Sequence, residues 1–209
     1  MLGVLTLPFA VALCTKADLG LSMIAAPTYI ISEKVSWLSY GQTEYIVQAL
    51  VLALMCIVVG KFKWAYLTSF VTALLYGSVL DLYIWLMRGW TPGAMWVRVL
   101  IFAAGMVFTA VGVSMFLHTY LAPCSYDYFV RTVVQEKNLD LRKFKLGNDA
   151  VYLVISVVLS LALFHGFVGV TWGTLVIVLC NGHLITAISN RMDRDIEFFD
   201  RFPKLAKYF

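Results

Sequence analysis

Three acidic residues interrupt long apolar stretches of this chain. They are Asp18, Glu44 and Asp81. At the centre of a bilayer a charged side chain costs about 2.5 kcal/mol or more, so each acid requires a partner or a function. Glu44 and Gln48 are four residues apart and share one helix face, which favours a cavity lined by both. These four side chains are candidate binding groups for an ion or a polar solute.

Asp81 continues a stripe of small residues with four-residue spacing. The stripe consists of Ser69, Ala73 and Gly77. Small residues at this spacing let two helices pack closely, so the stripe predicts helix packing and turns Asp81 towards protein. A structural alternative stays open for two of the acids, because Arg88 can pair with Asp81 and Lys16 can pair with Asp18.

The second half of the chain adds three candidates, which are Asp127, Asn181 and His183. His183 titrates near neutral pH, and Gly182 lets a neighbouring backbone approach Asn181. A lone histidine inside a membrane is also often a packing residue that is hydrogen-bonded to another helix. Asn148 or Asp149 is expected to cap a helix N-terminus.

Tyrosine hydroxyls and cysteine thiols add little to this set. Tyr29, Tyr76 and Tyr126 could offer hydroxyl groups to a solute, but interfacial belts account for most of the 11 Tyr and 6 Trp residues. None of the four cysteines stands at metal-ligand spacing from another, so we expect no disulfide, no metal and no cofactor. No HExxH or GxSxG motif is present, so we do not expect an enzyme.

The elements that carry these residues are predicted to be membrane helices. Of the 209 residues, 61% are hydrophobic and 13% are charged, whereas a soluble domain has about 45–50% and about 25%. The apolar runs predict an all-α polytopic membrane protein with six transmembrane helices. The expected spans are residues 2–15, 45–59, 64–87, 99–117, 150–164 and 168–189.

Six crossings would place both termini on one side of the membrane. That side receives 12 of the 16 Lys and Arg residues, and the positive-inside rule therefore makes the termini cytoplasmic. The net charge of +4 thus reflects topology and does not indicate nucleic-acid binding. The basic stretch 141–146 is expected among lipid headgroups rather than at a specific lipid site, and residues 191–209 are expected to form an interfacial tail.

The two halves of the chain resemble each other at an offset of about 105 residues. Residues 68–82 align without a gap with residues 173–187, and GQTEY (41–45) corresponds to GNDAVY (147–152). Each half then holds three crossings. Because three is an odd number, the halves must insert with opposite orientations, as in many transporter folds. The expected units are the inverted repeats 1–96 and 97–190, followed by the tail.

Each half also contains a segment that is too short or too polar to cross, residues 21–31 in the first and 121–134 in the second. Gly20, Pro27 and Pro123 are expected to interrupt the helix where these segments turn. Non-helical backbone at membrane depth must be buried in protein or line a wet cavity, so two re-entrant segments would frame a central site. The alternative is that both lie on the membrane surface as amphipathic caps.

The stretches KADLGLSM (16–23), GQTEY (41–45) and TALLYGSVLD (72–81) resemble the YczE/YyaS/YitT-like family of bacterial integral membrane proteins. Within it they are similar to the branch designated DUF6198, a domain of unknown function. The resemblance implies a multi-pass protein of the bacterial inner membrane with an Ala-Asp-Leu-Gly turn at residues 17–20, and it supplies no substrate. The first helix is shorter than is usual in the family, so either the chain starts upstream or the bilayer thins around it.

Two functional hypotheses follow from the sequence. The first is a small-solute transporter or channel-like carrier with a polar site between two inverted repeats. The second is a non-catalytic membrane protein that supports or regulates another complex. The expected partners are the lipid bilayer and an unknown small solute or ion. Nucleic acid is not expected, and a homodimer is left open.

Overall fold

The computed structural model describes residues 2–60, 65–117 and 124–195. Within these ranges the chain forms eight α-helices and no strand, which confirms the all-α class. The helices are α1 (Leu2–Ala17), α2 (Ala25–Lys34), α3 (Tyr40–Val59), α4 (Ala65–Leu86), α5 (Met95–Leu117), α6 (Ser125–Lys137), α7 (Leu141–Phe164) and α8 (Trp172–Asp195).

Five of these helices, α3, α4, α5, α7 and α8, are long and apolar enough to cross a membrane by length and composition. The apolar part of α1, Gly3–Ala17, is shorter, with about 22 Å of helix against a hydrocarbon core of about 30 Å. Six spans were expected, whereas five helices among the described residues have the length to span the membrane and α1 is shorter than this length.

The outer faces of the long helices are apolar. Leu50 on α3 is 64% exposed and Leu179 on α8 is 72% exposed, and the other long helices expose large hydrophobic side chains as well. Soluble monomers rarely expose contiguous apolar patches larger than a few hundred Å². These faces fit a lipid solvent, and the structure supports a polytopic helical membrane protein.

The start of α7 differs from the prediction. The expected span began at Ala150, but the helix begins at Leu141, and the carboxylate of its N-cap Asp140 accepts a hydrogen bond from the Lys143 N–H at 2.8 Å. Asn148 and Asp149 lie inside the helix, so their predicted capping role is wrong. Hydropathy ends a span at charged residues, whereas a helix begins where a side chain can cap its free N–H groups.

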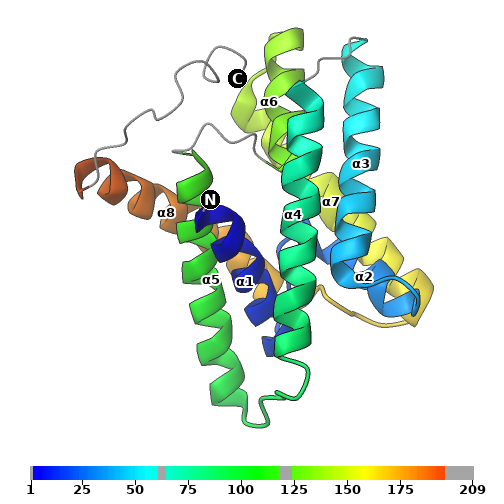
Figure 1. Ribbon diagram of the computed structural model, residues 1–209, viewed down its shortest axis with the longest axis vertical. Coiled ribbons are helices and arrows are strands. Elements are labelled where there is room, and N and C mark those ends of the chain that lie inside the picture. Colours follow the sequence, from blue (N-terminus) through cyan, green and yellow to red (C-terminus); the bar gives the residue numbers. More distant parts are fainter. Residues whose placement is uncertain (1, 61–64, 118–123, 196–209) are drawn as a thin grey trace.

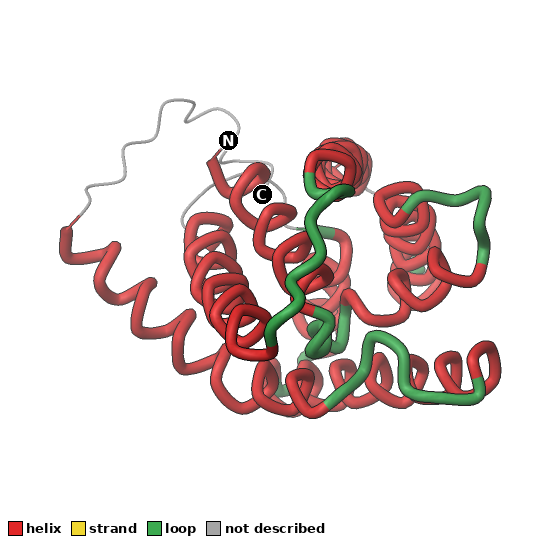
Figure 2. The backbone as a smooth tube through the Cα atoms, turned by 90° about the horizontal axis from the view of Figure 1, so that it is seen from below, coloured by secondary structure: helices red, strands yellow, loops and turns green. Residues whose placement is uncertain are grey.

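Two groups of helices make up the bundle (Figures 1 and 2). In the first group α1 packs against α4 and α5, and α5 packs against α8. In the second group the short helices α2 and α6 each contact both α3 and α7. Helix α4 joins the groups because it packs against α1 and α3. Helices α3, α4 and α5 follow the long axis of the molecule, whereas α7 and α8 are inclined to it (Figure 1).

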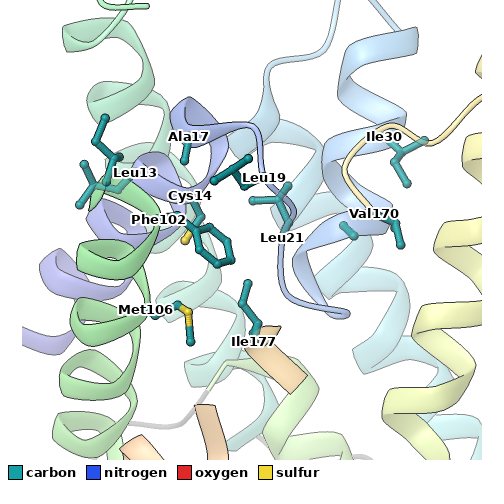
Figure 3. Close-up of a cluster of buried hydrophobic side chains, with 12 residues drawn as sticks. Leu13, Cys14, Ala17, Leu19, Leu21, Ile30, Phe102, Met106, Val170 and Ile177 are labelled. Atoms are coloured by element: carbon teal, nitrogen blue, oxygen red, sulfur yellow. The ribbon is translucent and has the colours of Figure 1, made fainter. Parts of the chain in front are cut away.

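A large buried apolar cluster joins α1 to α5 and α8 (Figure 3). Cys14 on α1, Phe102 on α5 and Ile177 on α8 belong to it, together with Leu19 and Leu21 from the turn that follows α1. The cluster therefore fixes the end of α1 against two long helices from the second half of the chain.

The turn at residues 17–20 docks onto the start of α8. Gly20 has a φ of +121°, and a Cβ at this position would lie 2.6 Å from the Thr174 backbone nitrogen. The Leu21 N–H donates to the Gly169 carbonyl at 3.0 Å, and the Thr171 hydroxyl donates to the Leu19 carbonyl. Glycine is required here by both its backbone conformation and the close approach of α8.

The two short segments are helical and differ in position from the prediction. Both α2 and α6 begin about four residues after the expected segment starts. Pro27 is the third residue of α2 and does not interrupt it. The N–H groups in the first turn of a helix have no carbonyl acceptor within that helix, so a proline there costs no hydrogen bond. Pro123 lies outside the described residues.

Helices α3 and α4 come into backbone contact at two glycines. A Cβ on Gly77 would lie 2.6 Å from the Gly41 carbonyl oxygen, closer than real side-chain atoms come. Ser69 and Ala73 on the same stripe are fully buried. The stripe is therefore a packing surface, as its four-residue spacing predicts.

We expect Gly77→Ala to lower the free energy of unfolding by about 1–3 kcal/mol, because the added methyl group meets the backbone of α3. Gly182→Ala is the matched control, since nothing in the described part of the chain lies within 4 Å of its Cβ position. Alanine there should be neutral or stabilise α8 by up to about 1 kcal/mol through helix propensity. Thermal unfolding in detergent measures both variants, and equal melting temperatures would contradict the close contact.

Candidate functional site

Glu44 is a deeply buried acid on α3. It is 4% exposed, and Gln48 one turn further on is fully buried. The helix begins just before Glu44 because Ser39 and Gln42 form a capping box, in which each side chain accepts a hydrogen bond from the backbone N–H of the other. This start places Tyr40, Glu44 and Gln48 on one helix face at four-residue spacing.

Gln48 joins Glu44 to the first turn of α6. Its side-chain nitrogen donates to Glu44 Oε1 at 3.2 Å, and its Oε1 accepts from the Ser125 backbone N–H at 3.1 Å. On the other side of Glu44, the Tyr40 hydroxyl donates to the carbonyl of Ala25, the first residue of α2, at 3.1 Å. The two short helices therefore both meet the polar face of α3.

Tyrosine side chains from four helices lie around Glu44. Tyr40, Tyr76, Tyr126 and Tyr152 each interact electrostatically with its carboxyl group. The rings of Tyr126 and Tyr152 pack edge to face with centroids 5.6 Å apart. Burial raises the pKa of the Tyr126 hydroxyl well above its usual range. These tyrosines with Glu44, Gln48 and Ser125 are called the Glu44 cluster below.

Three buried oxygen atoms of the Glu44 cluster make no hydrogen bond of normal geometry with any described residue, although the Thr28 and Tyr126 hydroxyl groups lie close to the Glu44 carboxyl group. The three atoms are Glu44 Oε2, Ser125 Oγ and the Tyr126 hydroxyl oxygen. Leaving a buried polar atom unsatisfied costs about 1–3 kcal/mol, and more when the group is charged. An unsatisfied group of this kind in a native interior is a place where an ion or ligand fits.

The Glu44 cluster combines one carboxyl group with hydroxyl oxygens and aromatic rings. This set suits a cation, because the carboxylate supplies the opposite charge and aromatic rings attract cations through their quadrupoles. No group of three His, Cys, Asp or Glu side chains in the described ranges is placed to hold a metal ion. A single buried carboxylate balances one positive charge, so the cluster favours a proton, a monovalent ion or an organic cation over a divalent metal ion.

Asp81 holds the beginning of α3 and does not belong to the Glu44 cluster. From α4, its carboxylate accepts from the Ser39 hydroxyl at 2.5 Å and from the Gly41 N–H at 2.7 Å. A carboxylate at this end of a helix also complements the helix dipole. These bonds take the place of the expected pairing with Arg88, so the role of Asp81 is structural.

Asp18 pairs with Arg98, whereas the sequence offered Lys16 as its partner. The Arg98 guanidinium lies 2.7 Å from Asp18 Oδ2, and the Asp18 side chain is 74% exposed. Arg98 Nε also donates to the Ala17 carbonyl at 2.7 Å. Arg98 thereby satisfies the C-terminus of α1, where the chain enters the turn at residues 17–20.

The candidates from the second half do not form a joint site with Glu44. Asp127 on α6 forms a half-exposed ion pair with Lys145 at 3.6 Å. His183 is exposed on α8, and Asn181 has a buried side-chain oxygen without a partner among the described residues. Helix α8 packs against α5, whereas Glu44 faces α2 and α6, so the fold separates these residues from Glu44.

An apolar groove of about 670 Å³ lies next to the Glu44 cluster. It runs between α3 and α7 beside Phe129 of α6, and most of its lining is Val, Leu, Ile and Phe. Lys143, Asn148 and Tyr152 are the polar side chains that line it. Because Tyr152 belongs to both the groove and the Glu44 cluster, the two are neighbours. This feature is called the α3–α7 groove below.

Sequence reasoning identified Glu44 and Gln48 but missed most of their surroundings. Tyr40 could have been found, because Tyr40, Glu44 and Gln48 form a stripe with four-residue spacing. Ser125 and Tyr152 carry no such signal, since only the packing of α6 and α7 brings them to α3. Tyr126 was a candidate hydroxyl group, although interfacial belts account for most tyrosines in such a chain.

A family model described as a family of unknown function (DUF6198) matches residues 1–190. The match confirms the resemblance to this branch, and the wider YczE/YyaS/YitT-like assignment stays a prediction. Neither the curated proteins nor the solved structures contained a match to the chain.

We expect Asp81→Ala to lower the free energy of unfolding by about 1.5–3 kcal/mol, because it removes charge-assisted hydrogen bonds at the start of α3. Asp127→Ala is the control, since it removes only a half-exposed ion pair, for which about 0–1 kcal/mol is expected. Denaturant unfolding in detergent measures both. A variant Asp81→Ala with wild-type stability would contradict the structural role of this residue.

Proposed function

Because the chain belongs to the family of unknown function DUF6198, whose description names no substrate, we propose its function from its own residues: it is a membrane carrier for a small cationic solute. The observation that carries the proposal is the buried Glu44 carboxyl group, whose Oε2 makes no hydrogen bond of normal geometry with any described residue. The carrier binds and releases its solute without covalent chemistry, so no enzymatic activity is proposed.

The Glu44 carboxyl group has to be neutralised while it is buried. An uncompensated charge in the interior costs several kcal/mol, so either a proton or a cation accompanies the carboxylate. Proton and solute then compete for the same oxygen atoms. In this proposal the carrier alternates between a protonated and a solute-bound form, and movement of the cation is coupled to movement of a proton in the opposite direction.

Helix order and helix contacts support the proposed arrangement as two inverted repeats. In both α1 to α4 and α5 to α8, an apolar helix is followed by a short helix and then by two long helices, although α1 has 16 residues and its counterpart α5 has 23. Under this correspondence the contact of α1 with α4 matches that of α5 with α8, and the contact of α2 with α7 matches that of α3 with α6. The short helices then frame the Glu44 cluster from the two halves.

The contact of α3 with α4 has no counterpart of similar extent between α7 and α8, and the small contact of α4 with α6 has none between α8 and α2. The first of these asymmetries supports a transport cycle. Helices α3 and α4 touch at Gly41 and Gly77, whereas nothing among the described residues lies within 4 Å of the Cβ positions of the aligned Gly147 and Gly182. In carriers built from inverted repeats, the two repeats rock against each other around the site. We infer that α7 and α8 approach each other at Gly147 and Gly182 in the opposite state.

The proposed location is the bacterial inner membrane, with both termini in the cytoplasm. This orientation counts the short apolar helix α1 as a sixth crossing, around which the bilayer thins. The excess of Lys and Arg in loops on one side supports this orientation. The beginning of α3, where Asp81 binds, then faces outward, and the beginning of α7 faces the cytoplasm. In this orientation the described state is closed towards the outside.

We expect purified protein in liposomes to take up a member of a panel of monovalent cations and organic amines when a pH gradient is imposed. Glu44→Gln should lower the initial rate by at least about tenfold, because the amide cannot carry the compensating charge. Glu33→Gln is the matched control, since Glu33 is exposed at the end of α2 and undergoes the same chemical change. If both variants behave alike, or no cation moves, the carrier proposal fails and a non-catalytic partner role replaces it.

We further expect spin labels at Val154→Cys and Leu179→Cys, exposed positions on α7 and α8 within two turns of Gly147 and Gly182, to report two distances in a variant without the four native cysteines. The shorter distance should gain population when the transported cation or the pH changes, because α7 and α8 then close. A label pair on exposed positions of α3 and α4, Ile46 and Leu82, should respond in the opposite sense. A single unchanging distance for both pairs would contradict the alternating movement.

A further inference from the structure

The lining of the α3–α7 groove changes from polar at one end to apolar at the other, as a phospholipid changes from headgroup to acyl chain. On α7 its lining residues lie on one helix face, beginning with Lys143, continuing through Asn148 and ending at Ile155. The basic and amide groups are thus at one end, and the Val and Ile side chains follow. Leu50 and Leu54 of α3 form the facing apolar wall.

The position of the groove matches one leaflet of a bilayer. The membrane-spanning part of α7 begins at Lys143, so this side chain lies at the depth of the lipid headgroups. From Lys143 to Ile155 the helix rises by about 18 Å, and one leaflet contributes about 15 Å of hydrocarbon. An acyl chain that starts at headgroup level therefore fits the length of the groove.

The charge at the polar end of the groove is not paired with any residue that the structure describes. The Lys143 side chain is exposed and makes no ion pair with any described residue, whereas the nearby Lys145 is paired with Asp127 and Asp149. A free ammonium group at this depth attracts anionic lipid headgroups. The sequence predicted only a general headgroup contact for this basic stretch, and the groove adds a place for the chain of a single lipid.

We propose that the α3–α7 groove is a specific binding site for an anionic phospholipid, with one acyl chain along Leu50, Leu54 and Val151 and the phosphate at Lys143 and Asn148. The site adjoins the Glu44 cluster at Tyr152 and shares no other lining residue with it, and it does not depend on the transport proposal. Tyr152 separates the acyl chain from the cluster, so the lipid is a resident of the fold and not the proposed solute.

Native mass spectrometry of the full chain in detergent tests the site with phosphatidylglycerol and phosphatidylcholine of identical acyl chains, and with inorganic phosphate alone. We expect phosphatidylglycerol to be preferred over phosphatidylcholine by about fivefold, the effect of one Lys near an anionic group, and phosphate alone not to be retained. Lys143→Gln should abolish this preference, and Lys143→Arg should keep it. Lys137→Gln, which removes an exposed charge outside the groove, should leave it unchanged.

The acyl-chain part of the site is tested separately by filling the groove. Leu50→Trp should reduce retention of both phospholipids by at least about fivefold by removing the space for the chain. Leu75→Trp is the control, because Leu75 is similarly exposed on α4 and does not line the groove. Three results would each overturn the proposal. The first is that Lys143→Gln and Lys137→Gln lose the preference for phosphatidylglycerol equally, and the second is that Leu50→Trp and Leu75→Trp lose lipid retention equally. The third is that inorganic phosphate alone is retained.

Discussion

The hydrogen bonds of Gln48 organise the polar interior of this protein. Its amide lies fully buried between a carboxyl oxygen of Glu44 and the first backbone N–H of α6, and it satisfies both. A buried amide is stabilising only when its donor and acceptor sides are both occupied, so this single side chain fixes how α6 approaches α3. The same geometry leaves the second oxygen of Glu44 without a hydrogen bond of normal geometry from the described residues. The candidate site is therefore a direct result of the contact that holds the short helix in place.

Three other charged side chains satisfy helix ends. Asp81 accepts from the N-terminus of α3, Arg98 donates to the C-terminus of α1, and the Lys34 ammonium donates to the Leu163 carbonyl near the end of α7 at 3.0 Å. Helix ends carry backbone groups without intrahelical partners, and in an apolar solvent these groups depend on side chains. In each case the charged side chain comes from a different helix, so it also ties two elements together. Glu44 differs from these residues because its carboxyl group accepts a hydrogen bond from the Gln48 side chain and does not satisfy a helix end.

The elements could be predicted from the sequence more fully than the site. Long apolar runs and the four-residue stripe from Ser69 to Gly77 depend on local spacing, and the structure contains the corresponding helices and the close contact at Gly77. The beginning of α7 could not be placed by hydropathy, because Asp140 caps a turn that is not apolar. The hydrogen bonds of Asp81 could not be predicted for a related reason. Only the tertiary packing of α3 against α4 shows that its carboxylate is already occupied by Ser39 and Gly41.

If both proposals hold, the lipid and the transport cycle are physically connected. The α3–α7 groove includes Gly147, the residue at which α7 is inferred to close on α8. A phospholipid that occupies the groove contacts a surface that moves, so its affinity differs between the two states unless α7 moves as a rigid unit with α3. A ligand shifts such an equilibrium only by the ratio of its affinities for the two states, and a lipid that binds both equally shifts nothing however tightly it binds. Lipid binding and alternation are therefore separable properties, and the coupling between them is limited by how far α7 moves relative to α3.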